Sequence, residues 1–174
     1  VVFDDAGAAA CRALAVRNRQ GLHIRDLAIH NGYYGLRLDN VDTSRFERVR
    51  VALAGEAGVS MDNGAETNQF TTCRVETSPN GFVQWPTGAG CDGNQFTGNQ
   101  AVNIASLGYQ IWSADNTFID NTASGCATGF NALSGTSLRI VLRGNLAELC
   151  NVAGFAIAGN ATVINNVSRN NGGN

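Results

Sequence analysis

Residues 94–123 read NQFTGNQAVNIASLGYQIWSADNTFIDNTA, a stretch in which one short pattern occurs twice. Phe96 is followed three positions later by Asn99, and Phe118 is followed at the same spacing by Asn121. Gly108 lies between the two copies. A pattern that returns after 22 residues predicts a solenoid, in which each period forms one coil of the chain.

The same pattern extends outward in both directions. Each copy has a bulky apolar residue and, three positions later, a second marked residue. This second residue is Leu, Val or Cys in the first three copies and Asn in the last four. Successive copies are separated by 22, 24, 26, 22, 24 and 21 residues, and the pairs are Ile24/Leu27, Phe46/Val49, Phe70/Cys73, Phe96/Asn99, Phe118/Asn121, Leu142/Asn145 and Val163/Asn166. A glycine followed by an apolar residue keeps step with them at positions 35, 58, 81, 108, 129 and 154. Two interleaved markers at one period predict stacked coils with one continuous core.

Composition agrees with one folded domain. The chain has 174 residues, of which 44% are hydrophobic and 15% are charged, which is too apolar for a disordered chain. We expect a single domain over residues 1–174 and leave open whether it is a fragment or the mature portion of a longer β-helix. The net charge of −2 gives no electrostatic basis for a nucleic-acid partner. No apolar run reaches the roughly 18 residues of a membrane span.

Each coil is expected to contain three short strands separated by turns. The first strand begins at the repeated glycine, as in Gly35-Leu-Arg-Leu-Asp39, where alternation directs Leu36 and Leu38 inward and Arg37 and Asp39 outward. The second strand carries the bulky apolar residue, and the asparagine follows at a tight bend. Stacking then predicts an interior column of Phe70, Phe96 and Phe118.

Asparagine suits the bend because its amide both donates and accepts, so that each side chain can bond to the next one along the stack. It also tolerates the left-handed backbone of a tight bend. We therefore predict a structural ladder of Asn99, Asn121, Asn145 and Asn166, with Cys73 occupying the same position one coil earlier.

These features resemble the right-handed parallel β-helix of the pectin-lyase-like superfamily. The segment GLHIRDLAIHNG at residues 21–32 is similar to one coil of such proteins, and the resemblance covers residues 12–171. It implies an all-β fold of about seven coils. The superfamily includes pectate lyases, polygalacturonases, alginate lyases and epimerases, phage tailspikes and non-catalytic surface proteins. In its enzymes the substrate lies along the outer face of the first strands.

Two carboxylates stand at one position of that face on neighbouring coils, Asp39 and Asp62. Such a pair can supply the acid and base of glycoside hydrolysis, and like charges at close range raise one pKa unless a cation lies between them. Arg37 stands beside Asp39 and is a candidate to neutralise it. Ca²⁺ is an alternative ligand, although two carboxylates fall short of the six to eight oxygens it prefers, and no metal site is assigned. The structural alternative is a pair of solvated Asp-Asn turns.

The next coils place large side chains on the same face. Trp85 and Trp112 are candidates for stacking on sugar rings, and the alternative is that loops such as 87–92 cover them. Gln110 and Asn131 are further candidate substrate-binding residues of this face.

His30, Tyr33 and Tyr34 precede the strand that carries Arg37. A histidine or tyrosine near an arginine resembles the lyase and epimerase arrangement, in which the cation holds a uronate carboxylate while a base removes the C5 proton. His30 and Tyr34 are therefore candidate catalytic residues, and a purely structural histidine is the alternative. The chain lacks the Asn-Thr-Asp and Gly-His-Gly motifs of polygalacturonases and the Asp-Pro-His motif of mannuronan epimerases.

The five cysteines contain no C-x-x-C pair, which argues against a zinc site. Cys126 and Cys150 each lie five residues after a ladder asparagine, so they occupy equivalent positions on adjacent coils. Neighbouring strands are about 4.8 Å apart, within the range that a disulfide bridges. A disulfide, which would indicate an exported protein, and two packed thiols both remain open.

Together these features predict a secreted or cell-surface protein of a bacterium or phage that engages a polysaccharide, with a uronate-containing polymer as one candidate. A lyase, an epimerase and a glycoside hydrolase are the candidate activities. The alternative is a non-catalytic structural module, such as a fibre, adhesin or tailspike rod, that associates end to end or as a trimer.

Overall fold

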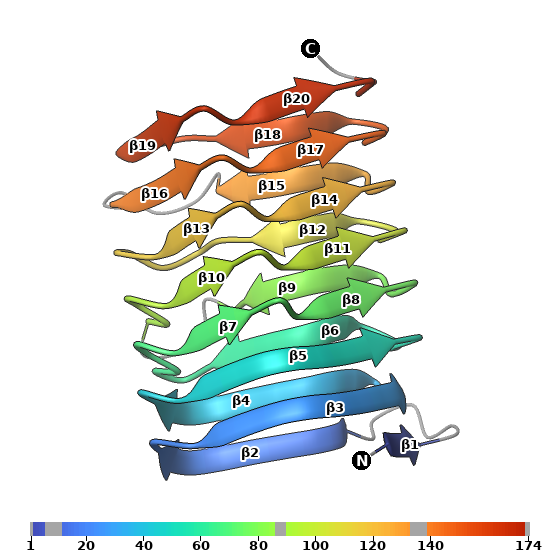
Figure 1. Cartoon of the computed structure of the whole chain (residues 1–174), viewed down its shortest axis with the longest axis vertical. Coiled ribbons are helices and arrows are strands. Elements are labelled where there is room, and N and C mark those ends of the chain that lie inside the picture. The colour runs from blue at the N-terminus through green and yellow to red at the C-terminus, as the bar shows by residue number, and fades with distance from the viewer. Residues whose placement is uncertain (1, 6–11, 86–89, 133–138, 173–174) are drawn as a thin grey trace.

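The computed structural model describes residues 2–5, 12–85, 90–132 and 139–172, which form twenty β-strands and no helix. The strands stack into a parallel solenoid along the long axis, with the N-terminal coils at one end and the C-terminal coils at the other (Figure 1). Two sheets face each other across the core, one of 13 strands and one of seven, here called sheet A and sheet B. The predicted all-β solenoid is confirmed.

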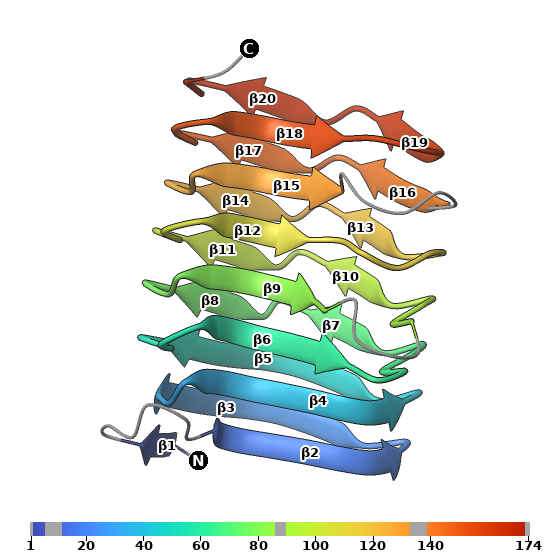
Figure 2. The ribbon, with the colours of Figure 1, turned by 180° about the vertical axis from the view of Figure 1, so that it is seen from behind.

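Sheet B contains one strand from each coil, the strand that starts near the repeated glycine, and it covers the face shown in Figure 2. Its strands all pair in parallel, and in chain order they are β2 (Arg12–Gln20), β4 (Tyr34–Asp42), β6 (Ala57–Asp62), β9 (Asn80–Gln84), β12 (Leu107–Gln110), β15 (Thr128–Ala132) and β18 (Ala153–Ile157).

Sheet A contains the rest of each coil. In the later coils this part is a pair of short strands on either side of the asparagine bend. The pairs are β7 (Gln69–Thr71) and β8 (Arg74–Glu76), β10 (Gln95–Thr97) and β11 (Gln100–Val102), β13 (Thr117–Ile119) and β14 (Thr122–Ser124), β16 (Ile140–Arg143) and β17 (Leu146–Glu148), and β19 (Ala161–Ile164) and β20 (Val167–Arg169).

The prediction of three strands in every coil is wrong for the first coils. There the two short strands are fused into the long strands β3 (His23–Asn31) and β5 (Arg45–Ala52), and β1 (Val2–Asp5) pairs with β3. Leu27 and Val49 occupy the bend position in these strands and point into the core. An aliphatic side chain cannot bond to the backbone groups of a sharp bend, so the sheet ladder runs on with only a local interruption at Asp26 and Arg48.

Two aromatic columns fill the core. On sheet A, the rings of Phe46, Phe70, Phe96 and Phe118 stack with centroid separations of 4.9, 4.9 and 4.6 Å. The predicted stack of phenylalanines is therefore confirmed. On sheet B, the rings of Phe82, Tyr109, Phe130 and Phe155 stack at 5.1, 4.6 and 4.9 Å. The two columns meet edge to face, for example Tyr109 against Phe118 at 6.0 Å, which is a favoured aromatic geometry.

Side-chain amides bond along the stack at the bend. Asn121 Nδ2 donates to Asn145 Oδ1 at 3.0 Å and to the Phe96 carbonyl at 2.9 Å, while Asn121 Oδ1 accepts from Asn99 Nδ2 at 3.0 Å. Asn145 Nδ2 continues the chain to Asn166 Oδ1 at 2.9 Å. The backbone N–H of Cys73 donates to Asn99 Oδ1 at 2.8 Å, so the thiol residue ends the row.

The left-handed backbone of the bend is not at the asparagine, as the sequence led us to expect, but at the residue before it. Positive φ angles occur at Thr72, Gly98, Asp120, Gly144 and Asn165. The amide must point inward to reach its neighbours, and the preceding residue supplies the turn that allows this.

A second row of buried amides lies at the turn that leads from sheet B to sheet A. Asn68 Oδ1 accepts from the backbone N–H of Ser44 at 3.0 Å, Asn94 Oδ1 accepts from that of Asn68 at 2.8 Å, and Asn116 Oδ1 accepts from that of Asn94 at 2.8 Å. Each of these asparagines is fully buried. They stand two residues before the core phenylalanine of their coil, a spacing that repeats in the sequence.

Four cysteines of the described chain, at positions 73, 91, 126 and 150, are buried free thiols. Cys126 and Cys150 lie on adjacent coils, and their mutual interaction raises the pKa of the Cys126 thiol and lowers that of Cys150. The structure thus shows the packed-thiol arrangement of the two alternatives considered for this pair.

Candidate functional site

The outer face of sheet B carries two columns of side chains. Strand register aligns Arg37 with Ser60, Ser60 with Val83, Val83 with Gln110, and Gln110 with Asn131. The second column starts with Arg17, Asp39 and Asp62. The predicted outward positions are therefore in register from coil to coil, as a solenoid requires.

One cavity on this face brings several predicted site residues together. It has a volume of about 350 Å³ and is lined by Tyr34, Arg37, Asp62, Asn63 and Trp85. Arg37 Nη2 lies 2.9 Å from Asp62 Oδ2, with 19% of the arginine side chain and 4% of the aspartate side chain exposed. The Arg37 guanidinium carbon also lies 5.0 Å from the centre of the Tyr34 ring, within cation–π range.

Arg37 does not pair with Asp39, which corrects the predicted neutralisation. Asp39 instead accepts a hydrogen bond from Asn63 Nδ2 at 2.9 Å and lies 3.6 Å from Arg17 Nε. The two carboxylates are neighbours in register, yet each has its own cation, because Arg37 reaches across to the next coil. Arg17 and Asn63 were missed as site residues. The available signals were that Arg17 lies one repeat before Asp39 and that Asn63 directly follows Asp62.

Trp85 is half-buried and forms one wall of the cavity. Its indole Nε1 donates to Ser60 Oγ at 3.0 Å, which fixes the ring over the preceding coil. Ser60 and Val83, both at outward positions, are fully buried. The face is therefore less open here than the alternation alone predicts.

Trp112 is also half-buried, and its Nε1 is buried without a hydrogen-bond partner among the described residues. It is not one of the cavity-lining residues, so the structure does not group the two tryptophans in this cavity. Gln110 and Asn131 are partly exposed and continue the first column beyond Val83, on β12 and β15. Part of the predicted covering loop, residues 87–89, lies outside the described residues.

Tyr33, just before β4, and Tyr34, its first residue, have raised pKa values for different reasons. Burial is the main cause for Tyr34, Glu56 and Asp62 add to it, and the Arg37 guanidinium opposes it. The Tyr33 hydroxyl donates to Glu56 Oε2 at 3.1 Å, and this bond is the main cause of its raised pKa. Both side chains therefore remain protonated phenols, and so hydrogen-bond donors, at neutral pH.

His30 lies away from this cavity. It belongs to β3 of sheet A, where it pairs in register with Ala52, and not to the turn that enters β4. The long strand β3 extends through Asn31, which moves His30 onto the other sheet. The predicted proximity of His30 to Arg37 is not seen among the cavity residues.

The described residues contain no group of three or more histidine, cysteine, aspartate or glutamate side chains arranged to hold a metal ion. Asp39 and Asp62 thus have no third acidic partner in this part of the chain. What the cavity offers is a set of hydrogen-bonding groups beside an aromatic wall, with an arginine–aspartate pair at its base. Nor does the described chain include any helix of a length and apolarity suited to crossing a membrane.

Solved structures with the same fold include two polysaccharide-acting proteins. The periplasmic alginate epimerase AlgG aligns with a TM-score of 0.68 at 14% identity, over 88% of this chain and 42% of AlgG. The pectate lyase Pel9A aligns with a TM-score of 0.60 at 14% identity, over 98% of this chain and 60% of Pel9A. The chain thus spans about half the length of these neighbours, and at this identity the likeness shows the fold alone.

Comparison with curated proteins finds no matching sequence. The family model described as the right handed beta helix region matches residues 12–174. The right-handed parallel β-helix expected from the repeats is therefore confirmed, and the chain belongs to this right-handed β-helix family.

Proposed function

We propose that the protein binds a polysaccharide on the outer face of sheet B, with the cavity of Tyr34, Arg37, Asp62, Asn63 and Trp85 as the central subsite. The observation that carries the proposal is the grouping of an aromatic wall, a tyrosine and an arginine–aspartate pair in one cavity of about 350 Å³. Ligand sites of that size combine apolar surface with a few polar groups that orient the ligand.

The chemistry of the cavity favours binding over a catalytic role for its carboxylate and phenol. A general base works best when its pKa lies near the working pH, whereas burial raises the pKa of Tyr34 above its usual value near 10. Asp62 is ion-paired with Arg37 and only 4% of its side chain is exposed. The Tyr34 hydroxyl is better suited to donating a hydrogen bond to a sugar hydroxyl or carboxylate, and Asp62 to fixing Arg37, than either is to proton transfer.

The two structural neighbours, an alginate epimerase and a pectate lyase, support a polymer of acidic sugars as the ligand class to test first. Such a ligand fits Arg37, because guanidinium groups bind carboxylates through two parallel hydrogen bonds. It also suits a protein that is secreted or displayed at the cell surface, where such polymers occur.

The test compares the affinity of the wild-type protein for uronate and neutral oligosaccharides with that of two variants. Trp85→Ala removes the aromatic wall and Arg37→Gln removes the charge, and each is expected to lower affinity about tenfold, equivalent to ~1.4 kcal/mol. Arg169→Gln is the matched control, because Arg169 is an exposed, ion-paired arginine on β20 of sheet A. Absence of binding by the wild-type protein across a broad panel of glycans would refute the proposal.

A second candidate is an assembly module, and it rests on a separate observation. The final coil exposes Val163, Ile164 and Val167 to 55%, 43% and 50%. Val163 is in register with the buried Leu142 of the preceding coil, and with Ile164 and Val167 it forms an apolar surface that a second copy of the chain could cover. A rise of the apparent mass with concentration in analytical ultracentrifugation, suppressed by Val163→Asp, would favour this candidate.

A further inference from the structure

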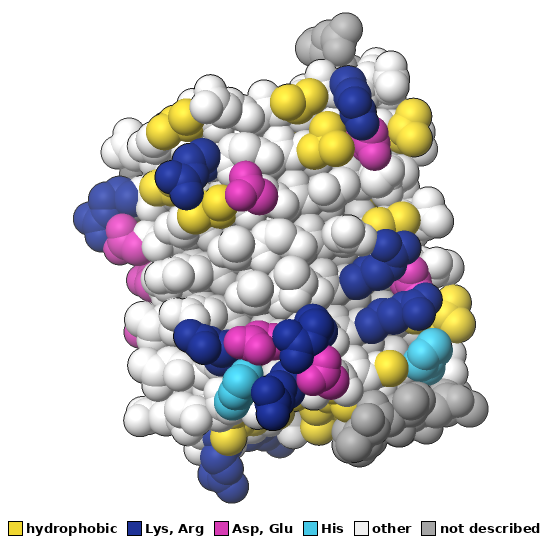
Figure 3. All heavy atoms as spheres, viewed as in Figure 1, with side chains coloured by type: hydrophobic (Ala, Val, Ile, Leu, Met, Phe, Trp, Pro, Cys, Tyr) yellow, Lys and Arg dark blue, Asp and Glu magenta, His cyan; other side chains and the backbone are white. Residues whose placement is uncertain are grey.

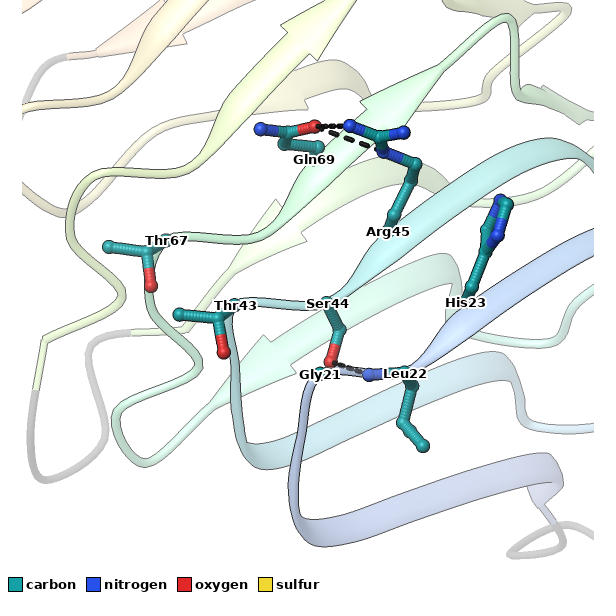
Figure 4. A pocket seen from close by; sticks show the side chains of 8 residues that line it. All are labelled: Gly21, Leu22, His23, Thr43, Ser44, Arg45, Thr67 and Gln69. Carbon is teal, nitrogen blue, oxygen red and sulfur yellow. Dashed lines mark hydrogen bonds between the residues drawn. The ribbon is translucent and has the colours of Figure 1, made fainter.

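A second cavity lies on the other side of the molecule, where the turn after sheet B enters sheet A. It has a volume of about 400 Å³ and is lined by Gly21, Leu22, His23, Thr43, Ser44, Arg45, Thr67 and Gln69. Figure 4 shows the threonines one above the other at the turn, with Arg45 and His23 projecting from β5 and β3. The cavity shares no residue with the site on sheet B.

Arg45 uses only some of its N–H donors in hydrogen bonds with the described residues. Its Nε and Nη2 both donate to Gln69 Oε1, at 3.2 and 3.0 Å. Its Nη1 lies 3.7 Å from Glu47 Oε1, beyond hydrogen-bond distance. A guanidinium has five N–H donors, so three have no partner among the described residues. With 54% of the side chain exposed, these donors can reach a ligand.

Several charged side chains of β3 and β5 surround Arg45. Glu47 is approached by His23 at 3.4 Å and by Arg45 and Arg48 at 3.7 Å each, and Arg25 is its register partner on β3. Arg48 is in turn held by Asp26 at 2.6 Å. The guanidinium groups of Arg25, Arg45 and Arg48 thus stand beside the carboxylates of Asp26 and Glu47 on β3 and β5. Two further carboxylates, Asp42 and Glu66, directly precede the two threonines at the turn. Figure 3 shows this gathering of charged side chains over β3 and β5, below a centre of uncharged polar groups.

The two threonines occupy a backbone position that glycine would hold more easily. Thr43 and Thr67 have φ angles of 48° and 52°, in the left-handed region that β-branched residues rarely adopt. Their backbone N–H groups bond to the next coil in the same way as those of Gly21 and Gly93, which fill the equivalent turns below and above. Threonine therefore replaces glycine in two of the three coils that line the cavity, where its hydroxyl adds a polar group to the wall, and Gly21 holds the equivalent position in the third.

We infer that this cavity is a second sugar-binding site, which takes the carboxylate of an acidic sugar residue on Arg45 and its hydroxyl groups on the threonine and Gln69 side chains. The unpaired donors of Arg45 recognise the carboxylate of the ligand, and the hydroxyl and amide groups recognise its hydroxyl groups. A cavity of about 400 Å³ is in the range of small-molecule sites. The site is distinct from the subsite proposed on sheet B, and it gives the molecule two faces on which to hold an acidic polymer.

The test is a titration of ¹⁵N-labelled protein with trigalacturonate, followed by backbone amide shifts. Saturable shifts are expected at the amides of Gly21, Thr43 and Thr67. Arg45→Gln is expected to weaken this binding at least tenfold. The control Arg139→Gln, in which an exposed arginine that pairs with Asp115 loses its charge outside the cavity, is expected to leave it unchanged. The methyl-esterified trimer, which lacks the carboxylates, is expected to bind at least tenfold more weakly.

The positions of the amides whose chemical shifts change distinguish the two proposed sites. Shifts only around Trp85 would overturn the second site and leave the first, and shifts only around Thr43 and Thr67 would do the reverse. Equal affinity of the Arg45→Gln variant, or of the methyl ester, would also overturn the inference, because recognition would not then depend on the arginine or on the charge. A Trp85→Ala, Arg37→Gln double variant that keeps the shifts at Thr43 supports two independent sites.

Discussion

Asn121 shows how one side chain links three coils. Its amide donates to Asn145 and to the Phe96 carbonyl, and its oxygen accepts from the backbone and side chain of Asn99. Asn121→Ala would leave a buried N–H and a buried carbonyl without partners, at about 1–3 kcal/mol each. We expect the free energy of unfolding, measured by urea denaturation, to fall by about 3 kcal/mol or more.

The matched control is Asn160→Ala, at an exposed asparagine near the start of β19. Surface substitutions of this kind change stability by about 0.5 kcal/mol or less. Equal effects of the two substitutions would contradict a stabilising role for the buried amides.

Tyr109 is a buried phenol within the sheet B aromatic column, and burial raises its pKa well above 10. In the unfolded chain a tyrosine has a pKa near 10. The stability that depends on the neutral phenol is thus fully present below about pH 10 and is lost as the pH rises above it. The raised pKa values of Tyr33 and Tyr34 act in the same direction.

We therefore expect the urea midpoint to be constant from pH 7 to 9 and to fall above about pH 10. Tyr109→Phe keeps the stacked ring and loses only a long hydrogen bond of 3.4 Å to the Thr122 carbonyl, so its midpoint at pH 7 should change little. Its decline above pH 10 should be shallower than that of the wild type. Identical alkaline profiles for the two proteins would show that Tyr109 ionises without opening the core.

The column of repeated glycines at the start of the sheet B strands has a steric cause. A Cβ atom on Gly81 would lie 2.2 Å from the backbone oxygen of Gly108, and one on Gly108 would lie 2.7 Å from that of Gly129. Real atoms do not approach that closely, so each coil packs on the bare backbone of its neighbour. This is why the glycine repeats in step with the phenylalanine.

Gly81→Ala should consequently force two coils apart. Overpacking of this kind costs about 1–3 kcal/mol, and contact with backbone leaves little room to relax, so we expect about 3 kcal/mol of destabilisation in urea denaturation. Gly55→Ala is the control, because its new methyl group would meet its nearest neighbour at an ordinary 3.5 Å. A Gly81→Ala variant as stable as the control would refute the steric explanation.

The cysteine pair on adjacent coils offers a separate test of core packing. Burial raises the pKa of Cys73 and of Cys91 to about 11, and Cys126 and Cys150 are almost fully buried in the core. All four thiols should resist iodoacetamide in the folded protein at pH 7.5 and react after denaturation. If Cys126 and Cys150 react only after denaturation with a reductant, the pair forms a disulfide and the free-thiol arrangement is wrong.

The stacking of equivalent strands explains why the fold could be predicted from the sequence. A solenoid places equivalent residues of successive coils in contact. Because each coil then has the same steric and hydrogen-bonding requirements, glycine, phenylalanine and asparagine recur at regular spacing in the sequence. The choice between Asp39 and Asp62 as the partner of Arg37 was not predictable, because both are within reach and the side-chain conformation decides. The burial of Ser60 and Val83 likewise depends on what packs over the strands. Alternation along one strand does not contain that information.

Across the whole molecule, each coil contacts mainly the coils directly before and after it, so stability is expected to vary along the axis. The central coils are enclosed on both sides, with Phe82, Phe96 and Tyr109 almost fully buried. The final coil has a neighbour on one side within the described chain, and its β19 and β20 are largely exposed. Opening should therefore begin in the coil of β18, β19 and β20.

Hydrogen exchange measured by mass spectrometry is expected to show the fastest amide exchange in peptides that cover β19 and β20, and the slowest in those that cover β9, β10 and β11. The physical reason is that local opening of the final coil exposes less buried apolar surface than opening of a central one. The measurement should be made at two protein concentrations. Protection of β19 and β20 that matches the centre at low concentration would contradict the gradient. Protection that appears only at high concentration would mean that a second copy covers Val163, Ile164 and Val167, as the assembly candidate requires.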